Sequence, residues 1–264
     1  MLSFDEQVAL AASAPFTGWD FRWMNARTTL TRPLPWSMSD EVSALAAGAR
    51  RMLDLGTGGG EWLSGLGARP ERTAATESWD VNAAVAAARL RPLSIPVIRS
   101  APAPENSSAE GITDSPDRTS RLPFRDRVFD LVTARHEAFR ADEVSRVMSS
   151  GGSFVTQQVD YHNFDDLYDL LGLRPPDYPR SWLPLAIGQL MSAGLEVRLA
   201  MSGEQHRRFP DVSTVIYYLR VVSWAVPGHG LTDLLPRLRR ASENAGRWPL
   251  TVRYRRFLVI ATKP

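Results

Sequence analysis

The fold is decided by residues 51–61, which read RMLDLGTGGGE. The run from Met52 to Leu55 is short and largely apolar, which predicts a buried strand over residues 51–55. The glycines that follow can take positive φ angles and let a ligand approach the backbone closely. Glu61 opens a helix, whose first N–H groups are free and lie at the positive end of the helix dipole. The stretch therefore predicts a strand, a ligand-binding turn and a helix; the alternative is a tight turn without a ligand.

Strands and helices alternate along the chain beyond this turn. Short apolar runs predict further strands, and Ala-rich or amphipathic runs predict helices. The expected strands span residues 73–77, 95–98, 128–134, 153–159, 196–201 and 254–262, and the expected helices span residues 81–90, 143–148 and 212–222. This alternation implies right-handed βαβ units and a mostly parallel sheet.

The sequence indicates an N-terminal extension followed by one large domain. Residues 1–45 are predicted to form a helical extension that acts as a lid, and residues 46–264 are predicted to form the α/β domain. Insertions around residues 160–182 and 203–250 are predicted to fold over the sheet on the side where ligands bind. The stretch 99–121 is too polar to bury, so it predicts a surface loop.

The composition is that of a globular protein and excludes several kinds of chemistry. Of the 264 residues, 44% are hydrophobic and 23% are charged, close to the average for folded domains. The chain has no cysteine, which excludes disulfides, thiolate metal sites and cysteine nucleophiles. With only four histidines, we expect no metal site. The net charge is +2 and basic residues form only short pairs such as Arg239-Arg240, so we expect no nucleic-acid partner.

No part of the sequence predicts membrane insertion or export. It contains no run of eighteen apolar residues, so we expect no membrane span. Asp5 and Glu6 precede the Ala-rich stretch near the N-terminus, whereas a signal peptide begins with positive charge. We therefore expect a cytoplasmic protein.

The spacing of the glycines argues against a dinucleotide. The fingerprint for that ligand reads Gly-x-Gly-x-x-Gly. A start at Gly56 places Glu61 at the last position. A start at Gly58 places Leu63 there. Both registers fail, and a pyrophosphate would also meet the negative charge of Glu61.

Two acids flank the glycines. Asp54 leads into them from the strand, and Glu77 lies 23 residues later at the end of the next strand. An acid at the second position can accept both hydroxyls of a ribose. Asp54 suits a ligand that has a positively charged amino group and no phosphate. S-adenosylmethionine has that character, because it combines an amino acid end, a ribose and a cationic sulfonium.

Further motifs follow the glycine loop in a characteristic order. Residues 122–124 (LPF) precede residues 129–132 (FDLV), and Gly151-Gly152 leads into the fifth strand. Over residues 50–160 and in the last strand, the chain resembles the class I S-adenosylmethionine-dependent methyltransferases, within a bacterial branch similar to methyltransferase type 11. The resemblance implies an α/β, Rossmann-like, seven-stranded and mostly parallel sheet with helices on both faces. It also implies an antiparallel last strand, an N-terminal helical extension and a small lid.

The resemblance implies that S-adenosyl-L-methionine is the cofactor. By position, the residues that would hold its methionine part and its ribose are Asp54, Gly56, Thr57, Gly58, Gly60, Glu77 and Ser78. The adenine contact is left open among Glu105, Asn106 and Asp114. Arg135 is a candidate for the cofactor carboxylate or a substrate anion, with a surface charge as the alternative. Trp36 either covers the cofactor or anchors the core.

The sequence lacks the motifs of several acceptor classes. Residues 133–136 read TARH where enzymes that methylate nucleic-acid amino groups carry Asn/Asp-Pro-Pro-aromatic. Methylation of pyrimidine carbon-5 needs a cysteine, which is absent. Gln157 and Gln158 stand beside Asp160 where metal-dependent catechol methylation needs clustered acids. We therefore expect transfer to an oxygen or nitrogen of a small molecule, by analogy in natural-product biosynthesis. The alternatives are an RNA or protein methyltransferase, which only the excess of arginine favours, and a non-methylating cofactor-binding member of the fold.

Two histidines are candidate general bases. His136 follows the fourth strand, and an imidazole titrates near neutral pH. His162 follows the fifth strand. For each, the alternative is a histidine in a loop or at a helix start without a catalytic role. Aromatic residues that could line an acceptor pocket or fill the core are Trp19, Trp23, Trp36, Phe209, Tyr217, Tyr218 and Trp224.

Overall fold

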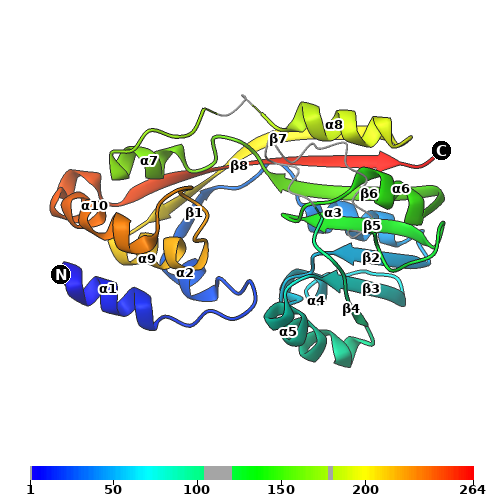
Figure 1. Ribbon diagram of the computed structural model, residues 1–264, viewed down its shortest axis with the longest axis horizontal. Helices are drawn as coiled ribbons and strands as arrows, with labels where there is room; N and C mark the ends of the chain where they lie inside the picture. Colours follow the sequence, from blue (N-terminus) through cyan, green and yellow to red (C-terminus); the bar gives the residue numbers. More distant parts are fainter. Residues whose placement is uncertain (1, 104–120, 178–180) are drawn as a thin grey trace.

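The sheet at the centre of the protein has eight strands (Figure 1). The computed structural model describes residues 2–103, 121–177 and 181–264. Within them the strands are β1 (Thr29–Arg32), β2 (Arg51–Leu55), β3 (Arg72–Glu77), β4 (Val97–Arg99), β5 (Phe129–Arg135), β6 (Met148–Val159), β7 (Glu196–Phe209) and β8 (Leu250–Thr262). Their order across the sheet is β1-β7-β8-β6-β5-β2-β3-β4.

Five neighbouring strands run parallel to one another. They are β4, β3, β2, β5 and β6. β8 runs antiparallel to both β6 and β7. The expected Rossmann-like, mostly parallel sheet with an antiparallel last strand is confirmed. β1 adds an eighth strand, antiparallel to β7, within the segment that we expected to be helical. It pairs with backbone groups that β7 would otherwise present as an open edge.

Helices cover both faces of the parallel part of the sheet. One face carries α3 (Met38–Ala46), α4 (Glu61–Ser64) and α5 (Asp80–Leu90), and the other carries α6 (Ala141–Val147) and α8 (Leu183–Ser192). Side chains along each strand alternate between the two cores. In β2, Met52 lies in the core with α3 and α5, and Leu53 lies in the core with α6 and α8.

β7 and β8 continue past the parallel strands into a second lobe (Figure 1). Both are longer than the expected ranges 196–201 and 254–262. Packed on their extension are α1 (Phe4–Ser13), α2 (Arg22–Arg27), α7 (Asp165–Leu171), α9 (Val212–Val221) and α10 (Leu231–Glu243). These elements share a separate apolar core around the fully buried Tyr217. Short 3-10 helices, η1 (Arg91–Leu93) and η3 (Ala245–Arg247), also lie in the described part of the chain.

The N-terminal segment belongs to this second lobe, because α1 and α2 pack against α9. The division at residue 45 stays a prediction, and α3 spans that position. None of the helices within the described ranges is both long and apolar enough to cross a bilayer.

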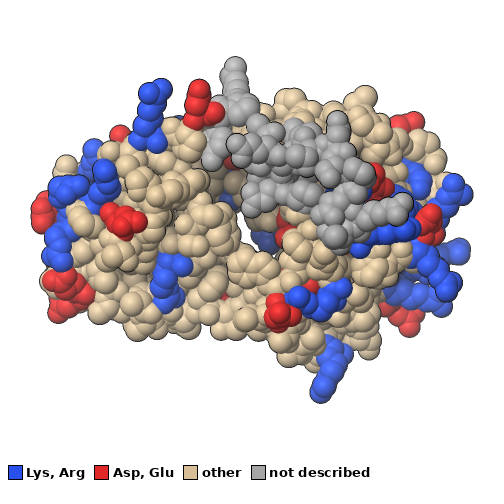
Figure 2. Space-filling view, viewed as in Figure 1, with Lys and Arg blue, Asp and Glu red and all other residues tan. Residues whose placement is uncertain are grey.

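The carboxyl ends of the parallel strands face the second lobe. The strand order reverses between β2 and β5, and ligands of open α/β sheets bind at the carboxyl ends next to such a switch point. Figure 2 shows a hollow in the surface between the second lobe and the strand lobe. The loops after β2 and β5 are therefore the expected place of a ligand site.

Candidate functional site

The loop after β2 has the backbone conformation that its glycines allow. Gly56 has a φ of 59° and Gly58 a φ of 62°, both in the left-handed region. The backbone N–H of Thr57 donates to the carbonyl of Thr76 at 2.9 Å, which holds the loop against β3. The predicted turn between strand and helix is thus present, with α4 beginning at Glu61.

Two side chains lie directly on this loop. A Cβ atom added to Gly58 would lie 2.3 Å from Cδ1 of Trp19, and one added to Gly56 would lie 2.2 Å from Cγ of Glu137. Trp19 belongs to the segment between α1 and α2, and Glu137 follows β5. The space that the missing glycine side chains leave is therefore filled from the second lobe and from the loop after β5.

Asp54, the acid before the glycines, is buried at the end of β2. Its Oδ1 accepts a hydrogen bond from the hydroxyl of Thr133 at 2.7 Å. Burial raises the pKa of Asp54 to about 6, although the bond from Thr133 and the charge of Arg135 oppose this shift. The guanidinium of Arg135, at the end of β5, makes no hydrogen bond or ion pair within the described residues. Its charge therefore acts on Asp54 without direct contact.

Glu77 ends β3 and fastens the glycine loop to the next helix. Its Oε2 accepts the backbone N–H of Gly58 at 2.7 Å. Its Oε1 accepts the backbone N–H groups of Ser78 and Trp79, each at 2.9 Å. The carboxylate is buried and fully engaged with backbone donors. Its predicted role toward a ribose stays a prediction, and the structure adds a second role, in shaping the loop.

Glu137 completes a group of three carboxyl groups around the loop. Burial, followed by the negative charges of Glu77 and Asp54, raises the pKa of Glu137 to about 7. The pKa values of Glu137 and Asp54 are raised mainly by burial, and the positive charge that the protein supplies near these groups does not offset this effect. The loop is therefore prepared for a ligand that brings a positive charge.

His136, one of the candidate bases, belongs to a hydrogen-bonded chain of three side chains. The indole N–H of Trp36 donates to Oε1 of Gln157 at 2.8 Å. Nε2 of Gln157 lies 3.2 Å from Nε2 of His136. Because indole can only donate, the amide oxygen must face Trp36 and its NH₂ group must face His136. Nε2 of His136 is then an acceptor, and the ring is neutral.

The charges near His136 agree with a neutral ring. His136 is exposed as a residue, yet protein surrounds its imidazole, and the lost hydration lowers the pKa of His136 well below its usual 6.5. The positive charges of Arg256 and Arg135 lower it further. His136 also has a φ of 57°, held by its N–H bond to the carbonyl of Gln157 at 2.8 Å. A backbone in this region is uncommon for a residue other than glycine.

Other predicted residues lie elsewhere in the cleft region. His162 makes an ion-pair contact with Asp165 at 3.3 Å in the loop after β6. Trp36 packs on Gly203 of β7, where an added Cβ would lie 2.9 Å from the indole, and its role in covering the cofactor stays a prediction. The candidates for the adenine contact, Glu105, Asn106 and Asp114, lie outside the described residues.

Comparison with solved structures identifies the architecture. A functionally unknown protein from Deinococcus radiodurans aligns with a TM-score of 0.54 at 14% identity, over 90% of this chain and 91% of that one. A candidate methyltransferase from Bacillus halodurans aligns with a TM-score of 0.51 at 16% identity, over 86% and 98%. The chain has the class I methyltransferase fold. No protein-family model matches its sequence, and neither does any curated protein.

A third solved structure with this fold is named for a different activity. The cyclase SpnF aligns with a TM-score of 0.50 at 17% identity, over 99% of this chain and 91% of that one. At such identities the likeness establishes the fold alone, and the site residues have to be argued from their own geometry.

Sequence reasoning missed two residues of the cleft. The sequence indicates Trp19 only as one of several aromatic residues that could line a pocket or fill the core. Nothing in the local pattern places it on Gly58. Arg256 lies in a short pair of basic residues, Arg255-Arg256, and such a pair does not by itself indicate a site. A signal for Arg256 exists in the alternation of strand side chains, which sends it to the opposite face from Arg255.

Proposed function

We propose that the protein is an S-adenosylmethionine-dependent methyltransferase that transfers a methyl group to an oxygen or nitrogen of a small molecule, in natural-product metabolism. The observation that carries the proposal is the group of three carboxyl groups, Asp54, Glu77 and Glu137, around a glycine loop at the switch point of a methyltransferase fold. S-adenosylmethionine brings the positive charge that these groups lack, on its sulfonium and its ammonium.

The residues around the loop fit this cofactor. Asp54, with Thr133 beside it, would hold the ammonium group. Glu77 would hold the ribose while it keeps its hydrogen bond to the backbone of the glycine loop. Glu137 covers Gly56 and would face the positive charge of the cofactor. The cofactor supplies an activated methyl group. Trp19 would then leave Gly58, because its indole fills the space over that residue.

His136 is the proposed general base. It is neutral at neutral pH, so its Nε2 lone pair, now held by Gln157, can accept a proton from an acceptor hydroxyl or ammonium. The bond from Gln157 holds the ring in one orientation until the proton moves. His162 is the second proposed base, and its contact with Asp165 would retain the positive charge of a protonated ring.

Two alternatives have less support. An RNA or protein methyltransferase would favour a continuous basic surface, whereas Figure 2 shows basic side chains dispersed among acidic ones on the face in view. A non-methylating enzyme would bind the same cofactor, and SpnF, which shares the fold, is named as a cyclase. Product analysis separates this second alternative from methyl transfer.

The test starts with cofactor binding. Calorimetry should detect binding of S-adenosylmethionine and no binding of ATP, which brings phosphates to the carboxyl groups. The same titration followed by tryptophan fluorescence should give a signal change that the variant Trp19→Phe loses. Mass spectrometry of reactions with small phenols, amines and hydroxy acids should then find a product heavier by one methyl group. Absence of cofactor binding at millimolar concentration would end the proposal.

A further inference from the structure

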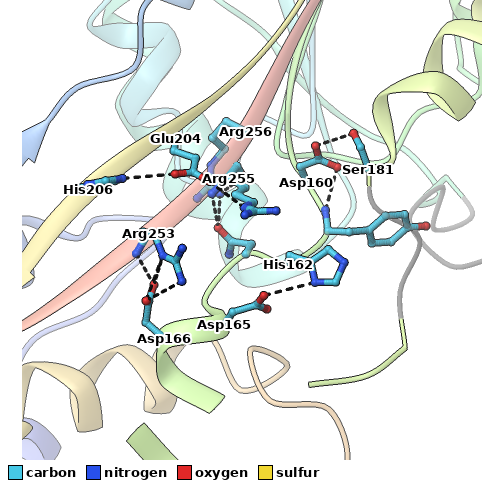
Figure 3. Close-up of polar contacts among 12 residues, drawn as sticks. Asp160, His162, Asp165, Asp166, Ser181, Glu204, His206, Arg253, Arg255 and Arg256 are labelled. Carbon is cyan, nitrogen blue, oxygen red and sulfur yellow. Dashed lines mark hydrogen bonds and ion pairs between the residues drawn. The ribbon is translucent and has the colours of Figure 1, made fainter. Parts of the chain in front are cut away.

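Three arginines lie within four residues of β8, and their partners differ. Arg253 makes an ion pair with Asp166 at 3.0 Å. Arg255 makes an ion pair with Glu204 at 3.0 Å. Figure 3 shows both pairs beside Arg256. Within the described residues, no carboxylate lies within ion-pair distance of Arg256. One of the three cations is thus left without an anion.

The hydrogen bonds of Arg256 leave most of its donors available. Its Nη1 donates to Oδ1 of Asn163 and to the carbonyl of Arg255, each at 2.7 Å. Its Nε–H and Nη2 groups have no hydrogen-bond partner in the described part of the chain. The guanidinium also lies 5.4 Å from the ring centre of Tyr254. The group is therefore held in place at one corner and open along the edge that recognises anions.

The strand register places Arg256 on the cleft side of the sheet. It lies opposite Val159 of β6 and Gly203 of β7, and it shares its face with Gln157, two positions along β6 from Val159. Its positive charge is the main charge that lowers the pKa of His136. Burial lowers the pKa of Arg256 itself to about 10, which agrees with a cation that has no anion beside it.

Two tyrosine hydroxyls lie in the neighbourhood of Arg256, and each can donate a hydrogen bond to an anion. The hydroxyl of Tyr254 is buried and has no hydrogen-bond partner among the described residues, with 6% of the residue exposed. Tyr218 of α9 is buried next to it, with ring centres 6.5 Å apart. Burial raises the pKa of Tyr218 well above 10, so its phenol stays protonated. Arg135 is a second guanidinium that bears on Arg256 and His136 by charge.

We propose that Arg256 is the centre of a carboxylate site for the methyl acceptor, which is then a small organic acid with an aromatic or apolar body. The guanidinium would bind the carboxylate through Nε and Nη2, and the rings of Tyr218 and Tyr254 would border the body of the acid. The assignment to the acceptor rests on the proposed function, whereas binding of the acid itself does not.

The two ends of the cleft then carry opposite charge. Asp54, Glu77 and Glu137 surround the glycine loop, whereas the charge of Arg256 acts on His136 and that of Arg135 acts on both His136 and Asp54. A cationic methyl donor and an anionic acceptor match these ends and attract each other when water is excluded from the cleft. An acceptor without a carboxylate would cover the half-buried Arg256 and leave its charge unpaired, which disfavours such an acceptor.

The test uses benzoate as the probe of a carboxylate, with benzamide as its uncharged counterpart and inorganic phosphate as another anion. Binding is measured by calorimetry on the full chain without S-adenosylmethionine. We expect the wild type to bind benzoate, to bind phosphate more weakly and not to bind benzamide. Arg256→Gln should weaken benzoate binding at least about ten-fold, the loss expected when charge-assisted hydrogen bonds disappear. Arg256→Lys, which keeps the charge but not the planar fork, should give an intermediate loss.

The matched control is Arg253→Gln, which removes an arginine from the same strand on the opposite face and should leave benzoate binding unchanged. Thermal unfolding of each variant verifies that it is folded. The proposal is overturned if the wild type does not bind benzoate at millimolar concentration, if Arg256→Gln and Arg253→Gln bind it alike, or if phosphate binds more tightly. Binding of S-adenosylmethionine is measured in a separate titration. Loss of benzoate binding alone overturns the carboxylate site, whereas loss of S-adenosylmethionine binding overturns the proposed function.

Discussion

The Nε2 atoms of His136 and Gln157 lie 3.2 Å apart, and the amide of Gln157 is turned so that its NH₂ group faces the imidazole. The indole of Trp36 fixes this orientation from the other side of the amide, at 2.8 Å. A protonated His136 would present an N–H group to the NH₂ group of Gln157, which costs a hydrogen bond and places two donors against each other. The chain of three side chains therefore selects the neutral form of the histidine.

Replacing Gln157 by glutamate should reverse this preference. In Gln157→Glu a carboxylate faces Nε2 of His136, so we expect the pKa of His136 to rise by at least about one unit. A pH titration of the histidine ring protons by NMR measures this value. The other three histidines, His162, His206 and His229, serve as internal controls and should titrate as in the wild type. An unchanged pKa of His136 would contradict the hydrogen-bonded chain.

Replacing Gly58 by alanine should destabilise the loop and close it to a ligand. The backbone φ of 62° costs about 1–2 kcal/mol for a residue with a Cβ, and that atom would lie 2.3 Å from Trp19. We expect the free energy of unfolding in Gly58→Ala to fall by at least about 2 kcal/mol, measured with urea. Gly67→Ala is the control, because an added Cβ there meets nothing within 4 Å. Equal stability of the two variants would show that the loop tolerates a side chain.

Glu77 should contribute to stability as well as to cofactor binding. In Glu77→Gln one amide N–H₂ group would face the backbone N–H of Gly58 or of Ser78, both of which need an acceptor. We expect a loss of about 1–3 kcal/mol in the free energy of unfolding. Glu77→Ala should weaken binding of S-adenosylmethionine by roughly ten-fold to a hundred-fold. The control Glu71→Gln changes an exposed acid just before β3 and should alter neither quantity.

Replacing Glu137 by glutamine should stabilise the ligand-free protein at high pH. The pKa of Glu137 is raised from 4.5 to about 7, so the folded state binds this proton more tightly than the unfolded state. Its contribution to stability therefore falls as the pH rises from about 4.5 to 7, and the penalty is complete above pH 7. Glu137→Gln removes that penalty.

We expect Glu137→Gln to unfold with a free energy about 1–2 kcal/mol higher than the wild type at pH 8, after allowance for partial exposure, and with little difference at pH 4.5. Urea unfolding at the two pH values measures this. Binding of a cation should also release protons from the wild type, which calorimetry in two buffers of different ionisation enthalpy detects. A stabilisation that is the same at both pH values would contradict the raised pKa.

The glycine loop was accessible to sequence reasoning because it depends on neighbours in the chain. The strand 51–55, the glycines and the acid at position 77 follow from short-range patterns, and β2 and β3 confirm the strands. The extent of β7 and β8 was not accessible in this way. Their outer halves, such as residues 203–209, are rich in polar residues and show no clear strand pattern. They are half-buried because they pack against helices that are distant in the sequence.

The sequence by itself determined the alternation of strands and helices, the ligand-binding turn and the acids at Asp54 and Glu77, since these depend on residue type and short spacing. Only the tertiary structure decided what surrounds them. Trp36 forms a hydrogen bond with Gln157, 121 residues away in the sequence. The pairing of β8 with β6 places Arg256 where its charge lowers the pKa of His136. The reason is physical: the register and order of strands in a sheet set which distant side chains share a face, and no local pattern encodes that order.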